Sequence, residues 1–312
     1  MTTFPGPYDC AGTKLWGWFA EADHAKLDAL CREVFAGATG GAIDYRPLGQ
    51  YVMVTFGDIA NVRPVPEPYH SMGVLDETQA AIWVPVVRVE EEGGRPTAVS
   101  LSFWVPFIWL ANAMSFATGR EGAGWAKTWG VPTMPASPED PQRFSLDVFG
   151  MDYSPTSRPA MHTLLTVEPI GPATGERKEY DSIADIARHV GPHLFGHHGQ
   201  DPDPEVHYGW RFDVSLLHDA IAHGLPEVFL KQSRSPHDGT RADLQEVVTS
   251  QATVRALHGA GLEHEHQLTV NPLDTHDLAG QLGLESQKLE FGYYVEMDFV
   301  QEVGVVAWPP SG

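Results

Sequence analysis

Near the start of the chain, apolar positions follow the spacing of an α-helix. Asp23 is a suitable N-cap, and apolar residues recur every three or four positions from Leu27 to Phe35, which predicts one buried helical face. Gly37 is expected to end the helix. Cys31 lies on the apolar face, so we expect it to pack in the core.

The remaining apolar pattern is mostly that of β-strands. Ala80–Val89 and Ala98–Val105 flank the polar turn Glu91–Gly94, which predicts a long hairpin. Ala111–Thr118 is compatible with a helix that leads into Gly119. Further strands are expected at Tyr51–Phe56, Val247–Leu257, His264–Val270, Phe291–Phe299 and Val303–Trp308. Since alternating βα units are missing, we predict an α+β fold with a mainly antiparallel β core and a few peripheral helices.

One segment has a different composition. Residues 171–224 are rich in His, Pro, Gly and Asp and contain two predicted short helices, Ser182–Val190 and Val214–His223. We interpret the chain as a single domain, 1–312, with an inserted accessory segment at about 171–224.

Charge and cysteine content narrow the classes of function. Asp and Glu number 41 against 20 Lys and Arg, a net charge of -21, and such a surface repels nucleic-acid phosphates and anionic membranes. The two cysteines have no metal-type spacing and indicate no disulfide framework. No run is apolar enough for a membrane span, and Met1–Gly12 lacks the pattern of a secretory signal. We therefore expect a cytoplasmic protein with no nucleic-acid and no membrane partner.

Lys127 has an unusual setting among the lysines of the chain. Trp125 and Trp129 lie two residues to either side, which in a strand is the same face as Lys127, and glycines surround the group. Desolvation would disfavour the ammonium form and supply a free amine that attacks carbonyls. The same pattern also fits a lysine that extends past two aromatic rings, with a cation–π contact.

Several motifs resemble the acetoacetate decarboxylase family. Gly119-Arg120-Glu121 followed by Lys127 is similar to its G-R-E-x-x-G-x-P-K-K signature, in which the first lysine forms the Schiff base. The block from Phe229 to Glu246, with Lys231 and the Asp238-Gly239 turn, resembles the family's downstream strand-turn-strand. The resemblance implies the acetoacetate decarboxylase-like fold, a partly closed sheet or barrel, and no cofactor or metal. Acetoacetate decarboxylase is itself a standard example of a lysine activated by its surroundings, so that expectation comes with the resemblance.

The chain departs from the family pattern at important positions. Thr128 replaces the second lysine, and Ala126 replaces the proline before the first one. In the family a pocket glutamate ends a Y-x-E motif six residues before a strand proline. Counting back from Pro85 places Gln79 there and Glu77 at the tyrosine position, so either the acid is lost or Glu77 has taken its place.

Other polar groups have a less specific pattern. Arg120 and Glu121 fit either a pair that shapes the pocket around Lys127 or a structural ion pair. His264 and His266 would share one face of a strand, as two metal ligands could, but no metal-binding motif accompanies them and we expect ordinary surface histidines.

The resemblance implies a lyase that forms a Schiff base between Lys127 and a small keto acid or ketone, of the decarboxylase or aldolase-dehydratase type. Its candidate catalytic residues are Lys127, Gln79 and Glu77, and its candidate substrate-binding residues are Arg120, Glu121, Trp125, Thr128 and Trp129. The alternative is a non-catalytic small-molecule-binding member of the same fold that has lost turnover. We also expect a homo-oligomer.

Overall fold

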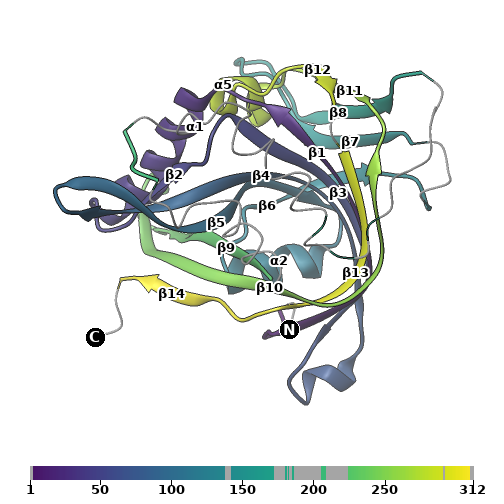
Figure 1. The fold of residues 1–312 in the computed structure, drawn as a ribbon, viewed down its shortest axis with the longest axis horizontal. Coiled ribbons are helices and arrows are strands. Elements are labelled where there is room, and N and C mark those ends of the chain that lie inside the picture. Colours follow the sequence, from purple (N-terminus) through teal and green to yellow (C-terminus); the bar gives the residue numbers. More distant parts are fainter. Residues whose placement is uncertain are drawn as a thin grey trace.

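The computed structural model describes residues 3–137, 142–171, 205–208, 224–290 and 292–309, together with Tyr180, Ser182 and Asp185. Strands dominate this part of the chain and form one continuous, mainly antiparallel sheet, with a few short helices (Figure 1). The predicted α+β class with a β core is therefore confirmed. No helix among these residues is long and apolar enough to cross a membrane.

Part of the sheet closes into a barrel, because β4 pairs both with β3 and with β5. The only parallel pairing within this ring joins β5 and β9. In order around the ring the strands are β4 (Leu75–Glu92), β5 (Arg95–Leu110), β9 (Leu225–Arg234), β10 (Ala242–Glu263), β13 (Gly292–Gln301), β1 (Tyr8–Glu21) and β3 (Tyr51–Pro64).

The sheet continues beyond the barrel as a second layer. It leaves the barrel from β5 through β6 (Lys127–Thr133), a short parallel neighbour, and then runs through β7 (Phe144–Gly150), β8 (Ala160–Pro169), β11 (His266–Val270) and β12 (Gln287–Leu289). This layer packs on the outer face of the barrel, where Phe144 contacts Trp16 and Trp18 with ring centroids 5.6 and 4.8 Å apart.

Burial on both faces explains the continuous apolar run in the centre of β4. Every residue from Ala80 to Val87 is buried, since one face points into the barrel and the other toward the second layer or the helices. Such a run has no strict alternation, and its length and β-branched content indicated the strand.

The other elements lie around the barrel and second layer. These are α1 (His24–Cys31) and its π-helical extension η1 (Arg32–Gly37), β2 (Asp44–Pro47), η2 (Tyr69–Met72), α2 (Ala113–Gly122), η3 (Asp274–His276), α5 (Leu278–Leu282) and β14 (Val305–Trp308). The helix predicted after Asp23 is confirmed, since the Asp23 side chain accepts hydrogen bonds from the backbone of Ala25 and Lys26. Cys31 is fully buried on its inner face, as expected.

Other predicted elements are also present. Within the predicted turn, Gly93 and Gly94 join β4 and β5 in a hairpin, while Glu91 and Glu92 still belong to β4. The helix predicted before Gly119 is α2, which extends to Gly122. The block from Phe229 to Glu246 forms two antiparallel strands, in which Lys231 lies opposite Glu246. Both helices predicted within 171–224 fall almost wholly outside the described residues, so the inserted segment and the single-domain boundary remain predictions.

Candidate active site

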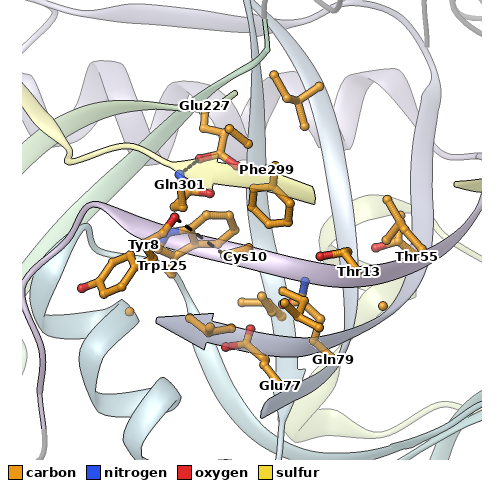
Figure 2. A pocket seen from close by; sticks show the side chains of 18 of the residues that line it. Tyr8, Cys10, Thr13, Thr55, Glu77, Gln79, Trp125, Glu227, Phe299 and Gln301 are labelled. Carbon is orange, nitrogen blue, oxygen red and sulfur yellow. Dashed lines mark hydrogen bonds between the residues drawn. The ribbon is translucent and has the colours of Figure 1, made fainter. Parts of the chain in front are cut away.

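A cavity of about 260 Å³ lies inside the barrel and is lined mainly by apolar and aromatic side chains. Side chains from β1, β3, β4, β9 and β13 face into it, together with residues of α2 and of the segment that follows α2. Figure 2 shows Glu77 beside Gln79, and Glu227 beside Gln301, with Cys10 and Thr13 between the two groups in this view. Polar groups from strands far apart in the sequence are thus brought to one cavity.

Lys127 lies in this cavity and is only 8% exposed, as its apolar context predicted. Its Nζ is 3.0 and 2.9 Å from the two carboxylate oxygens of Glu77 and 2.8 Å from Oγ of Ser115. Ser115 also donates to Glu77, so the three side chains form a closed hydrogen-bonded group. Buried charges need this kind of pairing, because an isolated ammonium or carboxylate would be costly to desolvate.

The local backbone explains how these groups meet. Asn112 caps α2 by accepting hydrogen bonds from the backbone of Met114 and Ser115, which fixes the first turn that carries Ser115. The helix ends in a turn at Gly124, whose φ of +85° favours glycine and where a Cβ would lie 2.6 Å from Cα of Lys231. This tight turn directs the chain into β6, which begins at Lys127.

Gly119 leaves the space that the lysine occupies. A Cβ at this position would lie 2.7 Å from both Cδ and Cε of Lys127 and 3.2 Å from Nζ. The glycine of the Gly-Arg-Glu segment is therefore required by the close packing of the lysine side chain on α2.

Glu77 and Gln79 point into the cavity from the same face of β4, as a two-residue spacing on a strand demands. Of the two, Glu77 makes the contact with Lys127, and it is buried. Gln79 lines the cavity further along the strand and packs close to Gly57. The acid beside the lysine is therefore the residue that the family pattern places at its tyrosine position.

Trp125 and Trp129 do not both cover the lysine. The Trp125 ring lines the cavity and packs on Phe229, with centroids 4.3 Å apart, and on Trp83 at 5.9 Å. Trp129 is 44% exposed and does not line the cavity. The expectation that two tryptophans enclose Lys127 is wrong for Trp129, because β6 pairs with β5 over only three residues and then leaves the barrel for the second layer.

Three further residues of the motif around Lys127 also lie outside the cavity lining. Thr128 and Glu121 are exposed. Arg120 is exposed as well, and its guanidinium donates to the backbone carbonyl of Lys127 at 2.8 Å and lies 5.5 Å from the centroid of the Phe116 ring. These positions correct the expectation that Arg120, Glu121 and Thr128 contact substrate in the pocket, and Arg120 instead holds the backbone that carries Lys127.

Glu227 is a cavity residue that the sequence reasoning missed. It lies on β9 with 1% exposure, and Nε2 of Gln301 donates to it at 2.7 Å. Burial raises the pKa of this carboxyl to about 8, against the opposing effects of the Gln301 hydrogen bond and of the charge on Lys127. The only sequence signal is a charged residue within the apolar run from Leu225 to Leu230.

The expectation of ordinary surface histidines is wrong for His266, which is fully buried. The His266 ring packs on Trp18, with centroids 5.1 Å apart, and its Nδ1 lies 2.7 Å from the backbone oxygen of His264. Within the described ranges, no group of three or more His, Cys, Asp or Glu side chains is arranged to hold a metal ion.

Comparison of the sequence with protein-family models and with curated proteins gives no match. The structure, in contrast, is similar to that of acetoacetate decarboxylase from Legionella pneumophila, with 13% identity, a TM-score of 0.61 and coverage of 98% of this chain and 89% of that one. A second acetoacetate decarboxylase gives 14% identity, a TM-score of 0.60 and coverage of 98% and 91%. The enduracididine biosynthesis enzyme MppR is also similar, with 11% identity, a TM-score of 0.57 and coverage of 99% of this chain and 91% of that one. The chain thus has the acetoacetate decarboxylase-like fold that the motifs implied.

Proposed function

We propose that the protein is a Schiff-base-forming lyase in which Lys127 condenses with the carbonyl group of a small keto acid or ketone. The observation that carries the proposal is the position of the Nζ atom of Lys127, which lies at a mainly apolar cavity within 3.0 Å of both oxygens of Glu77. An amine held beside a carboxylate in such a cavity has a base at hand to take its proton.

The geometry supports a chemical sequence with balanced protons. Glu77 takes one proton from the Lys127 ammonium, and the free amine adds to the substrate carbonyl carbon. A proton moves from the nitrogen to the oxygen of this adduct to give the carbinolamine. Glu77 then returns its proton to the carbinolamine hydroxyl, which departs as water, and the iminium stays attached to Lys127. Ser115, hydrogen-bonded to both groups, keeps Glu77 and Lys127 aligned through these transfers. The iminium is an electron sink that permits either loss of carbon dioxide or carbon–carbon bond formation and cleavage.

The structural neighbours support both branches of this chemistry. Two are acetoacetate decarboxylases, and MppR has been studied in complex with pyruvate and with the condensation product of pyruvate and imidazole 4-carboxaldehyde. Counting back from Pro85 places Gln79 at the family glutamate position, and its amide cannot exchange a proton as an acid. The Glu77 carboxylate beside Lys127 can exchange one, so the cavity supports both decarboxylation and aldol or dehydration chemistry. Carbon dioxide release from acetoacetate distinguishes them: efficient release by the native protein supports decarboxylation with Glu77 as the acid, whereas poor release that rises in Gln79→Glu supports aldol or dehydration chemistry in the native chain.

A binding protein without turnover is the second candidate. It is favoured by the closed group of Lys127, Glu77 and Ser115, in which the ammonium is fully paired and so has a structural role without any substrate. Product analysis separates the two candidates, because a binding protein would release the carbonyl compound unchanged.

The test of the proposal is reductive trapping. The protein is incubated with a panel of ketones and keto acids, including pyruvate and acetoacetate, and then with borohydride, and the labelled peptide is identified by mass spectrometry. We expect one adduct on Lys127 and none in Lys127→Ala. Equal labelling of Lys14 or Lys288, whose ammonium groups make exposed hydrogen bonds, would refute the assignment. A cytoplasmic location and a homo-oligomeric state remain predictions from the sequence.

A further inference from the structure

The charges in the cavity are already balanced without a ligand. Among the lining side chains that the structure describes, Lys127 carries the single positive charge, and the Glu77 carboxylate lies 2.9 Å from its Nζ. An iminium on Lys127 would keep one positive charge at the same atom, so Glu77 would match it equally well. A substrate carboxylate would therefore enter as an unmatched negative charge.

The second acidic residue of the cavity supplies no positive charge either. Glu227 is buried on the β9 side, and burial raises its pKa to about 8, so at neutral pH it is mainly a protonated, uncharged acid. A neutral carboxylic acid can donate a hydrogen bond to an uncharged carbonyl oxygen as well as to a carboxylate, so it offers a carboxylate no counter-charge. A substrate carboxylate would be a third carboxyl group in a cavity whose described lining has one positive charge, already matched by Glu77.

Uncharged hydrogen-bonding groups also face the cavity. The hydroxyl of Thr13 is buried, with 3% exposure of the residue, and has no hydrogen-bond partner. Thr13 lies on β1 level with Ile59 of β3, which in turn is level with Glu77 of β4. The amide of Gln79 also lines this space. A buried polar atom without a partner is costly, so a ligand oxygen that bonds Thr13 would recover that cost.

We propose that the cavity selects uncharged ketones with an apolar chain, and a hydroxyl or second carbonyl within reach of Thr13 and Gln79, over keto acids. The apolar lining accepts the chain, Lys127 meets the ketone, and the neutral polar groups bind the second oxygen. The inference rests on the proposed function of Lys127 and narrows its substrate class.

The test compares two ketones of the same shape that differ in charge. In 5-methylhexan-2-one, two methyl groups replace the two carboxylate oxygens of 4-oxopentanoate, and both compounds present the same methyl ketone. Each is incubated with the protein and borohydride at pH 7, and labelling of Lys127 is followed by mass spectrometry. We expect the uncharged ketone to label Lys127 at least about 10-fold faster at equal concentration, because an unmatched buried charge should weaken binding of the keto acid by more than about 10-fold.

A gain of keto-acid labelling should follow from adding a cation to the cavity. Gln79→Arg places a guanidinium on the face of β4 that carries Glu77, and it should shift the labelling ratio toward 4-oxopentanoate. Gln79→Met is the matched control, because it removes the same amide at similar length without adding a charge and so separates the effect of the guanidinium from the loss of Gln79. The comparison in the native chain decides the proposal even if Gln79→Arg fails to fold.

The outcomes separate this inference from the function on which it rests. Equal or faster labelling by 4-oxopentanoate in the native chain would overturn the substrate class and leave Lys127 as the nucleophile. If neither compound labels Lys127, the proposed function fails, and calorimetric binding of the same two compounds then decides the substrate class. Binding of 5-methylhexan-2-one alone supports it, and binding of 4-oxopentanoate with equal or greater affinity, or of neither compound, overturns it.

Discussion

Replacing Gly119 by alanine should slow imine formation at Lys127 much more than it weakens the fold. The new Cβ would lie 2.7 Å from Cδ and Cε of the lysine, whereas carbon atoms normally contact at about 3.5–4.0 Å. The end of the flexible side chain must therefore retreat by about 1 Å. That movement lengthens the hydrogen bonds of Nζ, now 2.8–3.0 Å, beyond the usual range. A misplacement of about 1 Å in a reacting group costs about 100-fold in rate.

The effect on stability should be smaller. Alanine in a helix gains about 0.5–1 kcal/mol over glycine, and overpacking costs about 1–3 kcal/mol. The two effects oppose each other, so we expect the free energy of unfolding of Gly119→Ala to fall by no more than about 2.5 kcal/mol. Urea unfolding followed by circular dichroism measures this change.

Gly122→Ala is the matched control, since it is the same substitution in the same helix and its Cβ would have no heavy atom within 4 Å. This variant should keep the native rate of borohydride labelling with 5-methylhexan-2-one. A native labelling rate in Gly119→Ala, or an equal loss in both variants, would show that space beside Lys127 does not control the reaction.

Three further expectations follow from the buried polar groups. Lys127→Met should lower the free energy of unfolding by about 3–5 kcal/mol, because it leaves the Glu77 carboxylate buried without its cation. Adding Glu77→Leu should recover most of that loss. A double-mutant cycle in urea measures both changes, and additive effects would argue against the pair. The folded chain holds a proton on Glu227 up to about pH 8, whereas the unfolded chain loses it near the ordinary value of 4.5, so this group stabilises the fold fully below pH 4.5 and progressively less as pH rises to about 8. Native protein should thus lose about 1.4 kcal/mol per pH unit across that window relative to Glu227→Gln, and parallel stability curves would refute the assigned pKa. Burial raises the pKa of the Cys10 thiol to about 12 and that of Cys31 as well, so neither should react with a disulfide reagent at pH 7 until the protein unfolds, and rapid reaction of the folded chain would contradict this.

The local sequence was sufficient to predict the elements that are stabilised by residues close to them in the chain. The side chain of Asp23 caps the first helix through neighbouring backbone groups, and the turn at Gly93 and Gly94 closes a hairpin between adjacent strands. Lys127 could be singled out because its glycine and tryptophan neighbours lie within a few residues of it. Glu77 and Gln79 share one face of β4, which begins at Leu75, but the predicted strand began only at Ala80 and the sequence did not show which of the two would meet the lysine.

The partners of that lysine were decided by tertiary structure alone. Glu77 is 50 residues from Lys127 in the sequence, and Glu227 comes to the same cavity only because β9 pairs with β5 when the barrel closes. Trp129 has the spacing of a residue that covers the lysine, yet it is exposed because β6 leaves the barrel after three paired residues. Hydrophobic periodicity and secondary-structure propensity describe only the segment in which a residue lies. Its burial and its charge partners depend on which distant strands pack around it. In this chain, closure of the barrel determined the burial and the charge partners of Lys127.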